Sequence, residues 1–334
     1  MTHSMSAQAP KTKNRMDQQA NPPHYLALSG GVGGAKLALG LSHVLPAEQL
    51  TIVANTGDDF EHLGLTICPD IDTLLYTLAD LNNKALGWGR QDESWHFMET
   101  LKALGAETWF QLGDRDLALH TIRTQKLAHG ETLSQVTHFL CQQLGISPNV
   151  TPMTDDPLKT IVKTTQGPLA FQHYFVREQC RPAITGIEFE GRHSAHPSAA
   201  FLHALHHPHL KAVIICPSNP FVSIAPIRSL PGIEERLNAR PVIAVSPIIA
   251  GKALKGPAAK MMQELKLPCT ALGVCEYYGS LLDGFVLDEA DAHYSQEMEA
   301  HGVRTLTTQT VMRTLNDRIQ LAEEVITWIN TIWP

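Results

Sequence analysis

The stretch SGGVGGAK, residues 29–36, follows a short apolar run and combines four glycines with a lysine. Glycines allow positive φ and let the backbone approach a phosphate closely. A helix that begins at such a turn also offers unpaired N–H groups and the positive end of its dipole. We therefore predict a nucleotide- or phosphate-binding group here. Its members are Gly30, Gly31, Val32, Gly33, Gly34 and Lys36, together with Asn55 at the end of the next apolar run.

The glycine turn matches neither of the common nucleotide-binding fingerprints. Lys36 is followed by Leu37, whereas a P-loop lysine is followed by a hydroxyl residue that holds Mg²⁺. Lys36 also stands where the dinucleotide pattern G-x-G-x-x-G, started at Gly31, requires its last glycine. These departures argue against P-loop ATP hydrolysis and ordinary hydride transfer. A tight strand-to-helix turn without a ligand is the structural alternative.

An acidic loop, NTGDDFEHLGLTICPDID, follows the second apolar run. Asp58 and Asp59 are adjacent, and Mg²⁺ favours one or two carboxylates together with substrate phosphates. We predict that these two residues are the metal ligands and catalytic carboxylates, which orient a hydroxyl nucleophile near the glycine turn. The alternative is that they are solvated loop charges. Asp70 is expected to cap the helix that follows it.

Three further positions could contact a ligand. Arg115, at a predicted helix start in LGDRD, either pairs with a neighbouring aspartate or binds a phosphate or carboxylate. Ser218 and Asn219 follow an apolar strand and suit hydrogen bonds to a base, sugar or phosphate. Trp88 and Trp95 could stack on a flat ring, although core packing is the more frequent use of tryptophan.

The elements that would position these residues alternate between strands and helices. Strands over 24–29 and 50–55 flank a helix over about 34–45, which predicts a βαβ unit and a parallel sheet. We expect an α/β fold, with a Rossmann-like, mostly parallel sheet and an additional, largely helical subdomain around 70–145. Residues 211–220 and 240–251 are each predicted to be a strand that runs into a turn, 284–292 and 303–310 are two later strand candidates, and 159–176 is predicted to be a pair of strands; the last helix is 317–332.

Composition narrows the class of protein. The 334 residues are 43% hydrophobic and carry a net charge of −7, so a basic nucleic-acid-binding surface is not expected. No apolar run reaches the length of a membrane span. The six scattered cysteines indicate reduced thiols and a cytoplasmic protein. Residues 1–23 are predicted to be a disordered tail, and residues 24–334 to form a single unit.

The order of the motifs resembles one enzyme family. LSGGVGGAKLALGL, NTGDD, ICPDIDTLLYTLA, GWGRQDESWHFMETL, WFQLGDRDLALHTIRTQ, PMTDDP, PSNPFVSI and SPIIAGKALKGPAAKM follow one another along the chain. Together they resemble the CofD family of 2-phospho-L-lactate transferases, called FbiA in some bacteria, which act in the biosynthesis of the deazaflavin coenzyme F-420. The resemblance covers about residues 25–330 and rests on long, specific motifs.

The resemblance implies a phosphotransferase-type reaction. The acceptor would be the deazaflavin Fo (7,8-didemethyl-8-hydroxy-5-deazariboflavin), and the donor a guanosine diphosphate ester of a lactyl, enolpyruvyl or glyceryl acid. The terminal hydroxyl of the ribityl chain of Fo would attack the β-phosphorus, GMP would leave, and Mg²⁺ would be required. The family is usually dimeric, so we expect a homodimer. No motif selects among the three donors.

The resemblance also assigns residues. Asp72, the second aspartate of PDxD, would contact Fo, as would the position before LGDRD. That position is often basic in the family but is Gln111 here, so a charged contact is lost or transferred to Arg115. Ser218 and Asn219 would meet the guanosine or Fo. The alternatives are a related nucleotide-binding transferase, of the nucleotide-sugar or gluconeogenesis-factor type, and a non-catalytic nucleotide- or deazaflavin-binding regulator.

Overall fold

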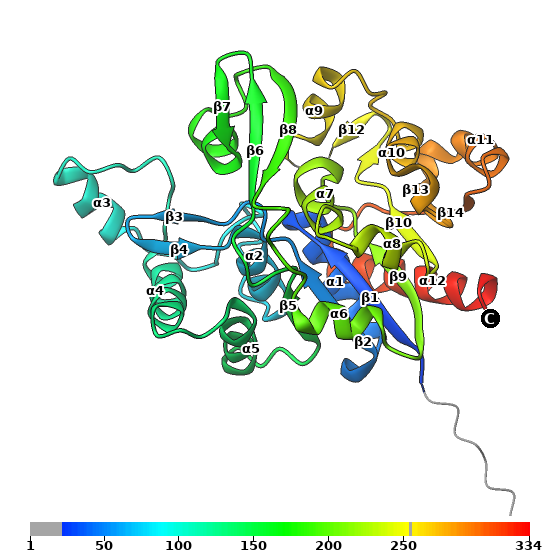
Figure 1. Cartoon of the computed structure of the whole chain (residues 1–334), viewed down its shortest axis with the longest axis horizontal. Helices are drawn as coiled ribbons and strands as arrows, with labels where there is room; N and C mark the ends of the chain where they lie inside the picture. The colour runs from blue at the N-terminus through cyan, green and yellow to red at the C-terminus, as the bar shows by residue number, and fades with distance from the viewer. Residues whose placement is uncertain (1–21, 254–255) are drawn as a thin grey trace, which may run out of the picture.

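Seven parallel strands form the central sheet, in the order β14-β13-β10-β9-β1-β2-β5 (Figure 1). The computed structural model describes residues 22–253 and 256–334, so the predicted tail lies almost wholly outside the described residues. The predicted α/β fold with a parallel sheet is confirmed. The strands are β1 (His24–Ser29), β2 (Leu50–Ala54), β5 (Asn149–Pro152), β9 (Leu210–Ile215), β10 (Val242–Val245), β13 (Gly284–Asp288) and β14 (Arg304–Thr308).

The strand order reverses beside β1. From β1 the chain adds β2 and β5 on one side, and it later adds β9, β10, β13 and β14 on the other. Loops that follow β1 and β9 therefore leave the same edge of the sheet in opposite directions. Open α/β sheets bind ligands in the crevice that such a reversal creates. The glycine turn follows β1, so the topology places it in this crevice.

Both faces of the sheet are buried, as expected for parallel strands. On β1, Tyr25 and Ala27 face one apolar core, whereas Leu26 and Leu28 face the other. The first core is covered by α1 (Gly31–Val44), α2 (Pro69–Leu78), α5 (Leu133–Gln143) and α12 (Leu315–Ile332). The second is covered by α6 (Ala199–Leu205), α7 (Ala225–Arg228), α8 (Ile233–Leu237), α9 (Ala258–Glu264), α10 (Ala271–Tyr278) and α11 (Ser295–Ala300).

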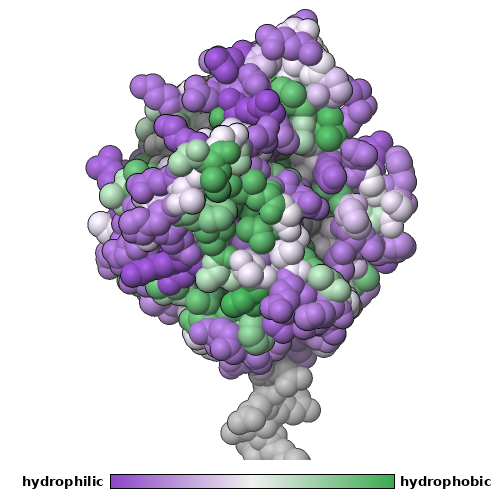
Figure 2. Space-filling model, turned by 90° about the vertical axis from the view of Figure 1, so that its left-hand side faces the viewer, coloured by the Kyte–Doolittle hydropathy of each residue, from purple (hydrophilic) through white to green (hydrophobic). Residues whose placement is uncertain are grey.

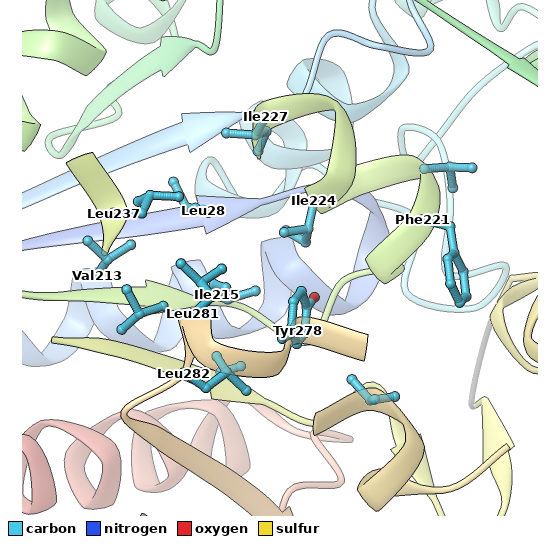
Figure 3. Packing of buried hydrophobic residues seen from close by; sticks show 14 of the residues in the cluster. Leu28, Val213, Ile215, Phe221, Ile224, Ile227, Leu237, Tyr278, Leu281 and Leu282 are labelled. Carbon is cyan, nitrogen blue, oxygen red and sulfur yellow. The ribbon is translucent and has the colours of Figure 1, made fainter. Parts of the chain in front are cut away.

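Figure 3 shows the second core from close by. Leu28 of β1 and Ile215 of β9 lie among side chains of the covering helices, including Ile224, Leu237 and Tyr278. Burying a side chain of this size contributes roughly 1.5–3 kcal/mol each before the entropy of ordering is subtracted. The strands that carry the candidate site are therefore anchored from both faces.

Two smaller units flank the crevice. One holds the hairpin β3 (Phe60–His62) and β4 (Leu65–Ile67), with α3 (His96–Ala103) and α4 (Asp114–Ala128). The other is an antiparallel sheet, β7-β6-β8. Its strands are β6 (Lys159–Thr164), β7 (Gly167–Ala170) and β8 (Ile184–Glu190). Four helices thus lie within the stretch predicted to be helical, and two of them, α2 and α5, pack on the central sheet.

Short elements complete the described chain. They are the π-helices His173–Arg177 and Pro220–Ile224, the 3₁₀ helices Ala47–Gln49, Gly279–Leu281 and Glu289–Tyr294, and the two-stranded ladder of β11 (Ile248–Ile249) and β12 (Lys252–Ala253). The prediction of strands throughout 159–176 was wrong at its end, where the chain turns into a π-helix. Helix α1 also begins three residues earlier than predicted, because the glycines themselves form its first turn.

Apolar side chains gather on the surface from which β3, β4 and α3 project (Figure 2). Large apolar residues exposed in this part of the chain are Leu63, Leu86, Trp88, Phe97 and Leu104. Within the described residues, no helix combines the length and the apolar character needed to cross a membrane.

Candidate functional site

The glycine turn meets the loop that follows β9. The N–H of Gly30 donates a hydrogen bond of 3.1 Å to Oγ of Ser218. Because β1 and β9 are neighbours at the reversal of strand order, their two loops form adjoining walls of one crevice. The predicted phosphate-binding turn and the predicted Ser218–Asn219 contact are therefore brought together.

The glycines of the turn serve two different purposes. A Cβ atom on Gly33 would clash with the carbonyl oxygen of Pro217, and one on Gly34 would lie 2.5 Å from Oγ of Ser218. These two glycines are needed for close packing of the two loops. Gly31 has a φ of +64°, and no heavy atom lies within 4 Å of the place its Cβ would take. Gly31 is therefore required for its backbone conformation and borders open space.

That open space is a cavity of about 690 Å³. It extends from the glycine turn along α2 to the loop around Trp88 and to residues 171–176, which include part of the π-helix His173–Arg177. Predicted site residues that line it are Gly30, Gly31, Val32, Gly33, Lys36, Asp58, Asp72, Gln111, Ser218 and Asn219. Asn55, Gly34, Asp59 and Arg115 are not among its lining residues.

A carboxylate pair stands at the glycine-turn end of this cavity. The side-chain amide of Asn55 donates to Oδ1 of Asp58 at 2.8 Å and to Oδ2 of Asp70 at 2.9 Å. The amide of Gln172 donates to the other oxygen of Asp58 at 3.1 Å. The N–H of Gly31 donates to the other oxygen of Asp70 at 2.7 Å. Asn55 thus does not border the cavity but fixes the two carboxylates that do.

The two carboxylates repel each other in a buried setting. Burial raises the pKa of Asp58 well above its usual value, and the neighbouring charges of Asp70 and Asp59 raise it further. Burial raises the pKa of Asp70 to about 6, although hydrogen bonds from Asn55 and Gly31 act in the opposite direction. Such a pair is stabilised by any cation that binds between its oxygens and the ligand.

Asp59 does not line the cavity. Its Oδ1 is buried without a hydrogen-bond partner, and burial raises its pKa well above the usual value. The thiol of Cys68 and the charge of Arg123 oppose that rise. Of the two adjacent aspartates, only Asp58 reaches the cavity.

Asp70 has a larger role than the expected helix cap, and the cap prediction was wrong. Helix α2 begins at Pro69, with Cys68 at the N-cap position. Asp70 therefore lies inside the first turn, and its carboxylate binds the start of α1 instead of its own helix. The sequence signal was present in PDID, but the contact with α1 depends on how the two helices pack.

Lys36 and Asn219 line the cavity while also serving the fold. The Lys36 ammonium donates to the carbonyl oxygen of Met312 at 2.9 Å. The Asn219 side chain accepts a hydrogen bond from the N–H of Phe221 and so caps the π-helix Pro220–Ile224. Both side chains border the cavity on the side of the glycine turn.

Asp72 belongs to a second polar group. The guanidinium of Arg123, which is completely buried, contacts both oxygens of Asp72. Nδ1 of His120 lies 3.6 Å from Asp72, and its Nε2 lies 3.0 Å from Asp116. Asp116 also accepts a hydrogen bond from the phenol of Tyr76. Tyr76, Asp116 and His120 all line the cavity, and the sequence analysis missed each of them.

Aromatic and aliphatic side chains form much of the remaining wall. They are Trp88, Phe110, Phe171, Phe175, Val176 and Ile249. Trp88 is 50% exposed, so it is not a core residue. Gln111 lies at the edge of this wall, beside Phe110. Arg115 lies outside the cavity, with its guanidinium 4.0 Å from Asp92, and thus follows the ion-pair alternative.

The chain matches a described family over nearly its whole length. Residues 26–325 match the family model for the 2-phospho-L-lactate transferase CofD. The 2-phospho-L-lactate transferase of Methanosarcina acetivorans is 39% identical over 92% of this chain and 99% of its own length. The phosphoenolpyruvate transferase of Streptomyces coelicolor is 37% identical over 90% of this chain and 97% of its own length.

Solved structures add evidence on the fold. The structure of protein BH3568 from Bacillus halodurans superposes with a TM-score of 0.58 at 15% identity, covering 91% of this chain and 99% of that one. A second structure of the same protein, BH3568, described as a member of the UPF0052 family, gives a TM-score of 0.59 at 14% identity and covers 91% of this chain and 98% of that one. At these identities the likeness concerns the fold alone. The family model and the relatives, in contrast, match most of the sequence, and the chain therefore belongs to the CofD family of 2-phospho-L-lactate transferases.

Proposed function

We propose that this protein transfers a phosphorylated three-carbon acid from a guanosine diphosphate ester to the deazaflavin Fo, in the biosynthesis of coenzyme F-420. The observation that carries the proposal is the position of Asp58 and Asp70 beside Gly31, at one end of a cavity whose other walls are largely apolar. The polar end suits a diphosphate, and the apolar wall suits a flat ring. Membership of the CofD family supports the same reaction.

The donor would lie with its diphosphate at the glycine turn. The start of α1 supplies the positive end of a helix dipole, and Lys36 adds a cation on the same side of the cavity. Ser218 and Asn219 border this region and would hydrogen-bond the nucleoside or its phosphates. Relatives are named for both 2-phospho-L-lactate and phosphoenolpyruvate, so the acid is left as a choice among lactyl, enolpyruvyl and glyceryl groups.

Magnesium fits the carboxylate pair. Two buried carboxylates with raised pKa values, fixed by a shared amide, form the acidic half of a typical Mg²⁺ site. Among the described residues, no three His, Cys, Asp or Glu side chains gather as a metal site, so we assign the other coordination positions to phosphate and water oxygens. Asp58 and Asp70 would hold the ion, which would neutralise charge on the phosphates. This assignment replaces Asp59 with Asp70.

The protein's own contribution is then mainly positioning. Phosphoryl transfer needs an attacking oxygen in line with the leaving oxygen, and charge stabilisation around the phosphorus. A bond forms between the acceptor hydroxyl oxygen and the β-phosphorus, and the bond from the β-phosphorus to the bridging oxygen breaks. GMP departs with that electron pair, and the hydroxyl proton passes to a carboxylate oxygen of Asp58 or to solvent.

Direct turnover tests this function. The purified protein is incubated with Fo, Mg²⁺ and each of the three guanosine diphosphate esters, and products are identified by mass spectrometry. We expect a phosphodiester of Fo and an equal amount of GMP from at least one donor. Asp58→Asn should lower kcat by at least about a hundredfold, the scale for loss of a group that stabilises transition-state charge. Tight binding of Fo and GDP without GMP release from any donor would instead support a non-catalytic binding protein.

A further inference from the structure

The cavity has a second polar corner that the chemistry at the glycine turn does not use. It is built where α2 faces α4, and we call it the α2–α4 corner. Its side chains are Asp72 and Tyr76 of α2 and Asp116, His120 and Arg123 of α4. All of them except Arg123 line the cavity.

Helix α2 connects this corner to the glycine turn. Asp70 contacts Gly31, and Tyr76 lies six positions further along the helix, a rise of about 9 Å. Asp72 follows Asp70 by two positions and Tyr76 follows it by six, so the corner begins about 3 Å along the helix axis from the carboxylate pair and extends about 6 Å further. A ligand that reacts at one end can be held at the other.

Arg123 fixes the position of Asp72 from behind. Its side chain is completely buried, and its two terminal nitrogens contact the two carboxylate oxygens. Nη1 also donates to the carbonyl oxygen of Thr66 at 3.3 Å and lies 3.3 Å from Nδ1 of His120. A bidentate pair of this kind sets both the place and the plane of a carboxylate. Arg123 does not border the cavity, so it reaches a ligand only through Asp72.

Asp116 is fixed in a similar way from the cavity side. It accepts a hydrogen bond from the phenol hydroxyl of Tyr76, and Nε2 of His120 lies 3.0 Å from its second oxygen. Burial alone would raise the pKa of Asp116, but contacts with His120, Tyr76 and Arg123 outweigh it and lower the pKa. Burial and the nearby Asp72 and Asp116 raise the pKa of Tyr76, which keeps it a hydrogen-bond donor.

We propose that Arg123, His120, Asp116 and Tyr76 are positioning residues that hold Asp72 as a preset hydrogen-bond acceptor for hydroxyl groups of the acceptor substrate. This inference rests on the function proposed above. Carboxylate oxygens accept hydrogen bonds and cannot donate them, so the corner selects a ligand with hydroxyl donors. The adjoining apolar wall selects one that also carries a ring. The residues of the α2–α4 corner therefore contribute to binding of the acceptor substrate and not to the reaction at phosphorus.

Steady-state kinetics with both substrates varied tests this role. Tyr76→Phe and His120→Asn should each raise the KM for Fo by about fivefold or more, the scale of one weakened hydrogen bond to a charged group. The KM for the guanosine donor and kcat should stay within about twofold of the wild type. Lys126→Gln is the matched control, because Lys126 lies on α4 but pairs with Glu131 and does not line the cavity. It should leave all three constants unchanged.

A conservative series at Arg123 adds a second comparison. Arg123→Lys keeps the charge but loses the planar fork, and Arg123→Met leaves Asp72 unpaired. The KM for Fo should rise from wild type to lysine to methionine. Removing a buried charge partner can prevent folding. If the Arg123 variants do not fold, Tyr76→Phe, which keeps the aromatic ring, tests whether the network affects the KM for Fo.

Three outcomes separate the possibilities. If the Tyr76→Phe and His120→Asn enzymes keep the wild-type KM for Fo while melting temperature or kcat falls, the network is only structural and the inference is overturned. An equal rise of both KM values also overturns it. If titration calorimetry shows that the wild-type protein does not bind Fo, the proposed function fails and the inference fails with it. Binding by the wild type with weaker binding by the variants supports the inference.

Discussion

The N–H of Gly31, the first residue of α1, donates a hydrogen bond of 2.7 Å to Oδ1 of Asp70 in the first turn of α2. This bond places a carboxylate at the positive end of a helix that also borders the cavity. The bond joins the glycine turn, which would hold the donor phosphates, to the Asp58–Asp70 carboxylate pair, which would hold a cation. Two helices that are separate in sequence thereby form one site.

A comparison of two glycines tests the role of this turn. Gly31 and Gly64 both have positive φ and open space at the Cβ position, but Gly64 lies in the β3–β4 turn. Alanine at either position should cost about 1–2 kcal/mol of unfolding free energy in urea titrations, because L residues are strained at positive φ. Only Gly31→Ala should also raise the KM for the guanosine donor. A donor KM unchanged in Gly31→Ala would exclude the turn from donor binding.

The carboxylate pair predicts an unusual dependence of stability on pH. In the unfolded chain an aspartate has a pKa near 3.8, whereas that of Asp70 in the folded protein is about 6. The folded state therefore binds more protons between these values, so the free energy of unfolding falls as pH rises from about 4 to about 6. The fall attributable to Asp70 is on the order of 3 kcal/mol, since its pKa rises from 3.8 to about 6 and one pKa unit corresponds to about 1.4 kcal/mol.

Urea titrations across this pH range, with a chelator present, measure the effect. Asp70→Asn removes one titrating carboxylate and relieves Asp58 of a neighbouring charge, so the slope should flatten. The readout is the slope and not the variant's absolute stability, because the substitution also alters the hydrogen bond between Asn55 and residue 70. A slope identical to that of the wild type would show that the pair does not titrate as inferred.

Magnesium should reverse the repulsion between Asp58 and Asp70. At pH 8, above the pKa of Asp70, a Mg²⁺ concentration of 100 times the Kd should stabilise the protein by about 2.7 kcal/mol. The rise in melting temperature should be smaller at pH 5, because protons compete with the metal. Asp58→Asn and Asp70→Asn should abolish the rise, whereas Asp59→Asn should retain it, since Asp59 does not line the cavity. If only Asp59→Asn lost the Mg²⁺-dependent rise in melting temperature, the assignment of the metal to Asp58 and Asp70 would be wrong.

Local patterns were sufficient to predict the parallel sheet and the glycine turn at the end of its first strand. The apolar run His24–Ser29, the glycine turn and the following helix form a βαβ unit, which is why the parallel sheet and the place of Gly31 could be predicted. The adjacent aspartates could not be ranked in the same way. Which of Asp58 and Asp59 faces the cavity depends on backbone direction in a loop, and no periodicity encodes that direction.

Side-chain contacts between residues far apart in the sequence could not be predicted either. Gln172 contacts Asp58 across 114 positions, and Arg123 contacts Asp72 across 51. Neither residue carries a local signal of its partner, because a buried arginine on an amphipathic helix resembles a surface arginine in sequence. Gly33 was predicted as part of the phosphate-binding turn, but the closeness of Pro217 that requires a glycine there arises only when β9 is placed beside β1.

Two tryptophans seven positions apart, Trp88 and Trp95, should behave differently. Trp88 is half exposed, lines the cavity and is flanked by Gly87 and Gly89, both at positive φ. Trp95 instead packs on a small core that contains Met98. Trp88→Ala should raise the KM for Fo about tenfold, the scale of a lost aromatic stacking contact, and leave the melting temperature within about 1 °C of the wild type.

Trp95→Ala should do the opposite, lowering the free energy of unfolding by about 2 kcal/mol with no change in the KM for Fo, because it removes packing and no cavity wall. Fluorescence gives an independent readout. Binding of Fo should quench tryptophan emission in the wild type and in Trp95→Phe, and the quenching should be weaker in Trp88→Phe. Equal quenching in both variants would mean that the ring of the acceptor does not lie against Trp88, and that the apolar wall receives another part of the substrate.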